Sequence, residues 1–216
     1  MLRRLALIPA LALGLYASAS LAANPQVELD TTAGAITLEL YPDAAPKTVA
    51  NFLRYVRDGH YNGTQFHRVI DGFMIQGGAY TADFSPRPTR PPIINEAEMS
   101  EKAGLHNVPG TIAMARTSNP DSAMDQFFIN VAVNKPLDFR SPDAAGMGYT
   151  VFGKVISGMD VVNKIAKMPK GGRKLPPGAP PVDPRSLTTE PVFISVAKII
   201  EPAKQDSTAE GKRTGS

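Results

Sequence analysis

The hydrophobic residues of this chain occur mainly in short runs in which apolar and polar positions alternate. In residues 35–41, Ile36, Leu38 and Leu40 fall on one face, which is the pattern of a half-buried β-strand. Gly, Pro, Asn and Asp separate these runs and favour turns between them. The pattern predicts eight strands, at residues 27–32, 35–41, 64–70, 73–77, 110–115, 126–131, 149–156 and 192–200.

Two stretches have apolar residues at helical spacing instead. Residues 46–57 place Val49, Phe52 and Val56 on one side, with a proline in the first turn and a glycine just past the end. Residues 159–166 show a shorter pattern of the same kind. Many short strands with two helices predict a mainly β fold, a closed or nearly closed barrel whose open ends the helices cover.

Two segments fit neither a strand nor a helix because they are rich in proline. Residues 85–92 hold four prolines and residues 169–191 hold seven, out of 20 in the chain. Proline fixes its own φ and cannot donate a hydrogen bond to a sheet. We therefore predict that both segments are stiff surface loops between core elements.

The first 22 residues have the pattern of an export signal. Arg3 and Arg4 precede a short apolar stretch, and small residues follow at positions 20–22. A membrane anchor is the weaker interpretation, because a spanning helix needs about 20 apolar residues. We predict cleavage near Ala22 and a periplasmic location. This leaves residues 23–202 as one domain and residues 203–216 as a flexible polar tail.

Charge and cysteine content exclude several classes of function. Without Arg3 and Arg4, the 23 basic residues fall to 21 against 20 acidic ones, which removes the main electrostatic argument for nucleic-acid binding. The chain has no cysteine, which excludes disulfides, thiolate metal sites, cysteine nucleophiles and lipidated cysteines. We expect no nucleic-acid partner and no stable membrane anchor.

Common catalytic patterns are missing from the sequence. His60, His67 and His106 do not have metal-ligand spacing, and no serine lies in a nucleophile-elbow motif. Glu96 and Glu98 lie in a polar segment, where solvated carboxylates are the expected interpretation.

The unusual feature lies in residues 66–78. Arg68 and Gln76 flank a tight turn at Asp71-Gly72, which can bring both side chains to one face of a hairpin beside Phe73 and Met74.

Five motifs resemble those of the cyclophilin-type peptidyl-prolyl cis-trans isomerases, especially the exported bacterial branch. They follow the family's order and span roughly residues 27–200. The resemblance implies an eight-stranded antiparallel β-barrel capped by two α-helices, with substrate bound in a groove on the outside of the barrel. The motifs are residues 66–78 and 110–117, residues 122–130 (SAMDQFFIN), Leu137-Asp138, and residues 151–159.

The resemblance also implies the site residues. Arg68 is the catalytic residue of the matched motif, and Gln76 can bond the substrate carbonyl. Pro136 departs from the tryptophan that many eukaryotic members carry before the matched leucine, a position at which bacterial members vary. The substrate-binding positions implied are His67, Phe73, Met74, Gln76, Ala115, Arg116, Thr117, Phe128, Leu137 and Tyr149.

These residues predict a non-covalent isomerase without metal or cofactor. A cation that donates to the prolyl nitrogen stabilises the twisted amide more than the planar one, and Arg68 can supply it. We expect a monomer whose partners are proline-containing, unfolded or partly folded exported proteins. Two alternatives stay open: an exported binding protein in which turnover is unimportant, and a ligand-carrying barrel, which the bulky Ile36, Leu38 and Leu40 argue against.

Overall fold

The computed structural model describes residues 23–200. The predicted signal segment, residues 1–22, and the predicted tail, residues 203–216, lie outside the described residues. Within residues 23–200, no helix is both long enough and apolar enough to cross a bilayer.

In the described part of the chain, nine antiparallel strands form one sheet in the order β3-β9-β1-β2-β8-β6-β7-β5-β4. Every pairing in the sheet is antiparallel. The strands are β1 (Gln26–Thr31), β2 (Gly34–Leu40), β3 (Thr64–Gln65), β4 (Arg68–Ile70), β5 (Met74–Gly77), β6 (Thr111–Met114), β7 (Phe127–Asn130), β8 (Val151–Ser157) and β9 (Phe193–Ile200).

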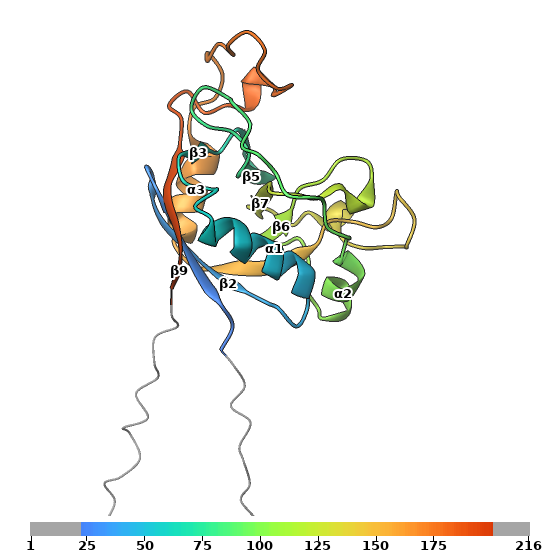
Figure 1. The fold of residues 1–216 in the computed structure, drawn as a ribbon. Helices are drawn as coiled ribbons and strands as arrows, with labels where there is room; N and C mark the ends of the chain where they lie inside the picture. The colour runs from blue at the N-terminus through green and yellow to red at the C-terminus, as the bar shows by residue number, and fades with distance from the viewer. Residues whose placement is uncertain (1–22, 201–216) are drawn as a thin grey trace, which may run out of the picture.

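The sheet curls into a nearly closed barrel (Figure 1). Its two end strands, β3 and β4, are separated along the chain only by Phe66 and His67, so the two edges of the sheet lie next to each other. The prediction of eight strands is wrong by this one division. The run 64–70 pairs with β9 at its start and with β5 at its end, and therefore forms two strands.

Strand alternation sends side chains to two separate apolar clusters. Ile36, Leu38 and Leu40 are fully buried in the main core inside the barrel, as predicted. On β5, Ile75 belongs to that core, whereas Met74 belongs to a second cluster on the opposite face. The interior is filled by side chains, which leaves the outer face for binding.

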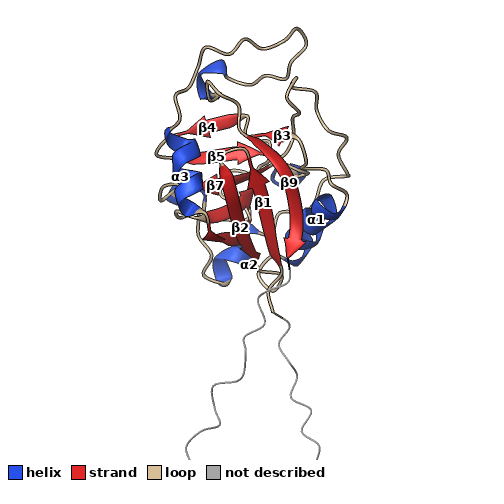
Figure 2. Ribbon diagram, turned by 90° about the vertical axis from the view of Figure 1, so that its left-hand side faces the viewer, coloured by secondary structure: helices blue, strands red, loops and turns tan. Residues whose placement is uncertain are grey.

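Two helices cover the barrel as predicted. Figure 2 shows α1 (Pro46–Arg57) and α3 (Met159–Lys167) on opposite sides of β1, β2 and β9. Phe52 from α1 and Ile165 from α3 are fully buried in the main core. A third helix, α2 (Ala97–Lys102), was not predicted, because six residues are too few to show a helical period.

The N-terminus of α1 is capped by a carboxylate from a distant segment. Glu96 accepts hydrogen bonds from the backbone N–H groups of Lys47 (3.0 Å) and Thr48 (2.8 Å), and from the Thr48 hydroxyl (2.8 Å). Glu96 is only 3% exposed, so its interpretation as a solvated carboxylate is wrong. Glu98 is half-exposed and pairs with Lys102, as expected of a surface residue.

The long proline-rich segment is a loop with an ordered base. Gly171 N–H donates to the Leu187 carbonyl at 2.8 Å, and Thr189 N–H donates to the Pro169 carbonyl at 2.8 Å. The loop extends from the barrel in orange in Figure 1 and returns through a short 3-10 turn, η3 (Pro184–Ser186). This turn packs against β4, the strand that carries Arg68.

Candidate active site

A cavity of about 170 Å³ opens on the outer face of the sheet. Its floor is the second apolar cluster, in which Met74, Ala113, Phe128 and Val151 are buried. The lining comes from β4, β5, β7, η2 (Lys135–Leu137) and the segments after β6 and before β8. The lining residues are Arg68, Phe73, Met74, Gln76, Ala115, Arg116, Phe128, Leu137 and Tyr149.

The β4–β5 hairpin places Arg68 directly opposite Gln76. The two residues are register partners across the hairpin, whose turn uses Gly72 at a φ of 69°. Arg68 Nη1 donates to Gln76 Oε1 at 3.3 Å, and the guanidinium carbon lies 5.7 Å from the centre of the Phe73 ring. These contacts hold the guanidinium over the cavity and leave other N–H groups available.

Gln126 extends this polar pair and was not identified from the sequence. Gln76 Nε2 donates to Gln126 Oε1 at 2.9 Å, so Gln126 fixes the amide orientation that presents Oε1 to Arg68. Gln126 lies in the quoted motif of residues 122–130, just before the paired phenylalanines. Its place at the start of a predicted strand, next to an inward-facing aromatic residue, was the signal available.

The apolar part of the cavity combines aromatic and aliphatic side chains. Phe128 and Tyr149 are 5.7 Å apart between ring centres in an edge-to-face arrangement. Leu137 lies on η2, and its carbonyl accepts from Tyr149 N–H at 2.9 Å. Asn134 Nδ2 donates to the Phe73 carbonyl at 2.9 Å, which ties η2 to the hairpin. Asn134 was also missed, because its role is in contacts distant along the chain.

A second guanidinium lies at the rim of the cavity. The Arg116 side chain stacks on Tyr149, with the guanidinium carbon 4.5 Å from the ring centre, and its Nε donates to the Gly148 carbonyl at 2.8 Å. Among the residues that the structure describes, none that lines the cavity carries a carboxylate. Within residues 23–200, neither Arg68 nor Arg116 is in ion-pair contact with an acidic side chain.

Two of the predicted site residues do not line the cavity. His67 is buried behind it, with its ring 4.7 Å from that of Tyr80. Burial lowers the pKa of His67 to about 4, and the nearby Arg68 charge acts in the same direction. Thr117 lies on the loop after β6, where its hydroxyl donates to Ser122 Oγ at 2.8 Å.

Comparison with known proteins assigns the chain to a family. Residues 26–185 match the family described as cyclophilin type peptidyl-prolyl cis-trans isomerase/CLD. The chain is a cyclophilin-type protein. It is 47% identical over 198 residues to a peptidyl-prolyl cis-trans isomerase of Acinetobacter baylyi, covering 92% of this chain and 100% of the relative. It is 50% identical over 145 residues to peptidyl-prolyl cis-trans isomerase B of Escherichia coli, covering 67% and 86% respectively.

A solved structure agrees with the cyclophilin fold. A cyclophilin-type isomerase of Cryptosporidium parvum superposes with a TM-score of 0.61 at 24% identity, covering 83% of this chain and 99% of that one. The mainly β, curled antiparallel fold predicted from the sequence is therefore confirmed. In this cyclophilin-type barrel, the outer cavity can hold a small apolar ring of a ligand. The N–H groups of Arg68 can then donate to a polar atom of the ligand next to that ring.

Proposed function

We propose that this peptidyl-prolyl cis-trans isomerase accelerates rotation of X-Pro bonds in exported proteins, with Arg68 as its catalytic residue. The observation that carries the proposal is the Arg68 guanidinium, held by Gln76 at the edge of an apolar cavity. Membership of the cyclophilin-type family supports the same activity.

The barrier to this reaction is the partial double bond of the amide. Resonance makes rotation about the peptide bond cost about 18–20 kcal/mol. An X-Pro bond exchanges on a timescale of about tens of seconds without a catalyst. In the twisted state the lone pair is localised on the prolyl nitrogen, which then becomes a hydrogen-bond acceptor. A donor aimed at that nitrogen lowers the barrier without any covalent step.

Arg68 is suited to be this donor. An arginine guanidinium carries a positive charge and several N–H groups in a fixed plane. Arg68 Nη1 donates to Gln76, and no acidic side chain within residues 23–200 is in ion-pair contact with the guanidinium. The free N–H groups therefore point a full charge at the substrate nitrogen, in a partly buried site where electrostatic interactions are stronger than in water.

The other site residues bind and orient the substrate in this proposal. The proline ring packs on Phe73, Met74, Phe128 and Leu137, while the Gln76 amide bonds a substrate carbonyl. Residues 115–117 offer backbone groups to an extended substrate. Tyr149 forms the rim, whereas His67 is buried behind the cavity against Tyr80 and does not contact the substrate. This set needs no metal or cofactor for the isomerisation itself.

The proposed substrates are proline-containing chains in the periplasm that have not yet folded. The export signal predicted for residues 1–22 supports this location. Contacts to one ring and to the backbone fit many sequences, so we propose a monomeric enzyme with broad substrates. Cell fractionation tests the location: the processed chain is expected in the periplasmic fraction, and retention in the cytoplasm would contradict it.

An NMR exchange assay on a short X-Pro peptide tests the catalytic role. We expect Arg68→Ala to lower kcat/KM by about 100-fold or more, the usual effect of removing a preorganised donor. Arg57→Ala, an exposed arginine in the last turn of α1, is the matched control and should leave the rate unchanged. Equal rates for wild type and Arg68→Ala would overturn the role of Arg68.

The same variants test the alternative of a binding protein without turnover. Suppression of aggregation of an unfolded protein can be measured beside the peptide assay. Isomerase activity that is lost together with aggregation suppression supports one site for both. Wild-type protein that suppresses aggregation but does not accelerate peptide exchange would favour the binding protein and contradict the enzyme.

A further inference from the structure

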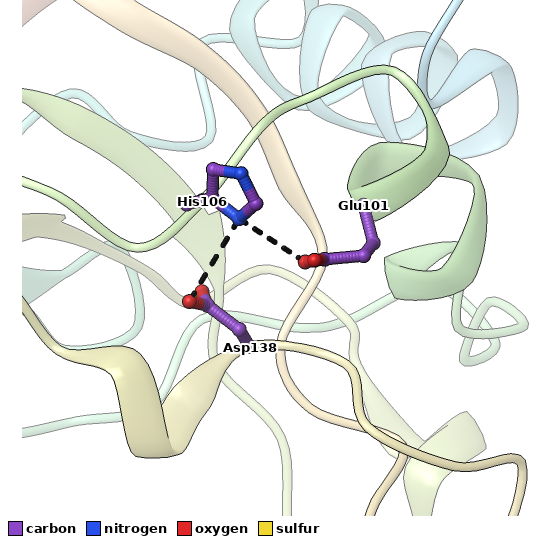
Figure 3. A group of neighbouring side chains, drawn as sticks. All are labelled: Glu101, His106 and Asp138. Carbon is purple, nitrogen blue, oxygen red and sulfur yellow. Dashed lines mark ion pairs between the residues drawn. The ribbon is translucent and has the colours of Figure 1, made fainter.

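Glu101, His106 and Asp138 form a cluster that lies apart from the isomerase cavity. Figure 3 shows the carboxylates of Glu101 and Asp138 pointing at the imidazole of His106. Glu101 lies on α2, His106 on the loop after it, and Asp138 directly after η2. His106 Nδ1 lies 3.2 Å from Glu101 Oε2 and 3.9 Å from Asp138 Oδ2. One potential ligand atom from each residue lies within 4.8 Å of the others. We propose that these three residues bind a divalent transition-metal ion of the Zn²⁺ type.

The type of ligand supports this class of metal. One imidazole nitrogen and two carboxylate oxygens suit Zn²⁺ and its neighbours, whereas Ca²⁺ and Mg²⁺ prefer oxygen ligands alone. Bonds of about 2.0–2.1 Å to a tetrahedral ion place its ligand atoms about 3.4 Å apart. The observed spacing of up to 4.8 Å therefore needs a contraction of at most about 1.4 Å. The partly exposed side chains of Glu101 and His106 can make this movement. Water can fill the fourth position.

The backbone holds the three residues ready for binding. After α2, Gly104 adopts a φ of 76° and its N–H donates to the Glu101 carbonyl at 2.9 Å, so the chain turns back toward the helix. Asp138 Oδ1 accepts from Asn107 N–H at 2.7 Å and from Asn107 Nδ2 at 2.9 Å. These bonds fix the carboxylate and leave Oδ2 toward His106, as outer hydrogen bonds do in metal sites.

The charges around the cluster favour binding of a cation. Within residues 23–200, His106 is the one ion-pair partner of both Glu101 and Asp138. Lys135 and Arg140 line the same hollow, of about 450 Å³, but lie beyond ion-pair distance from these carboxylates. Two carboxylates that share one histidine therefore keep net negative charge when the imidazole is neutral, which is the form that binds metal.

A bound ion would act on the wall of the isomerase cavity. Asp138 directly follows Leu137, which lines that cavity. The ion would join α2 and the loop after it to the end of η2. This consequence alone rests on the proposed function, whereas metal binding does not.

Calorimetric titration of the untagged mature chain with Zn²⁺ alone tests the site. We expect one saturable site, weakened tenfold or more in His106→Gln and in Glu101→Gln. Glu98→Gln is the matched control, because it removes an exposed carboxylate of the same helix that points elsewhere, and should bind as wild type does. Unchanged affinity in both cluster variants, or no saturable binding at about 1 mM Zn²⁺, would overturn the proposal.

NMR of the wild-type protein gives a readout that does not depend on variants folding. Zn²⁺ should shift the His106 ring and the Asn107 amide, and Ca²⁺ at the same concentration should shift neither. Equal responses to both ions would indicate an oxygen-only surface site and would contradict the histidine ligand. A peptide exchange assay run in parallel separates the two proposals, since a protein inactive as an isomerase can still bind Zn²⁺ at this site.

Discussion

His67 lies directly beside the catalytic candidate in sequence but faces away from the cavity. It is 4% exposed, and its Nδ1 has no hydrogen-bond partner among residues 23–200. Burial lowers its pKa to about 4, so the ring is neutral in the folded protein at neutral pH. The unfolded chain takes up a proton near the usual pKa of about 6.5. His67 therefore links folding stability to pH.

The sign of this link is destabilisation by acid. Between pH 6.5 and 4 the unfolded state binds more protons than the folded state, so the free energy of unfolding falls as the pH falls. A shift of this size corresponds to about 3 kcal/mol. We expect denaturant unfolding of wild type to lose about that much more stability from pH 7.5 to 4 than His67→Gln does. If the free energy of unfolding changed with pH in the same way for wild type and His67→Gln, the result would contradict a buried, neutral His67 ring.

Contacts between site residues could be predicted from the sequence where the residues are close together along the chain. Arg68 and Gln76 flank one tight turn, so their meeting follows from hairpin geometry. Gln126 and Asn134 act through partners 50 and 61 residues away, Gln76 and Phe73. The Glu101–His106–Asp138 cluster was missed for the same reason, because Asp138 reaches His106 only through the fold.

At the scale of elements, the helix α1 depends on a cap that its own sequence lacks. Ala45 at the N-cap position makes no side-chain hydrogen bond to the first turn. Glu96 supplies these bonds from a segment 48 residues away and places its negative charge at the positive end of the helix dipole. The apolar pattern and Pro46 were enough to predict the helix, but not what stabilises its start.

Glu96→Gln should therefore destabilise the fold. The change removes the charge and places an NH₂ group against backbone donors, which leaves a buried donor without a partner. We expect a loss of about 3 kcal/mol in the free energy of unfolding, measured by urea denaturation. The control Glu98→Gln removes one exposed i,i+4 ion pair with Lys102 and should lose about 0.5 kcal/mol or less. If both variants lost a similar, small amount of unfolding free energy, the Glu96 cap would not contribute to the stability of the fold.

At the scale of the whole molecule, closure of the sheet assembles the site from distant segments. The apolar pattern predicted each strand, but not which strands lie side by side, since pairing depends on contacts far apart in sequence. The proline-rich residues 169–191 are an example. Their composition predicted a loop, whereas the structure places η3 of that loop against β4, beside Arg68. Hydrogen bonds with Arg185 lower the pKa of Asp183, and the charge of Arg68 adds to this effect.

This placement predicts that the loop contacts long substrates. Replacing residues 172–186 by a short glycine turn keeps the bond at the base of the loop from Gly171 N–H to the Leu187 carbonyl. It removes η3 and the bond from Arg173 to Gln65. One such bond contributes about 1 kcal/mol, so the barrel should stay folded. We expect kcat/KM on a tetrapeptide to stay within about twofold, because Arg68, the proposed catalytic donor, is untouched.

A protein whose refolding is limited by one X-Pro bond provides the contrasting substrate. Its chain is long enough to reach past the cavity to η3, which contacts β4. We therefore expect the shortened variant to catalyse its refolding several-fold less efficiently than wild type. A double substitution, Asp183→Asn with Arg185→Gln, removes the exposed charged pair without shortening the loop. A loss shared by this variant assigns the contact to those two side chains. If the shortened variant lost kcat/KM equally on the peptide and on the protein substrate, the loop would act by supporting β4. That result would contradict a contact between the loop and the substrate.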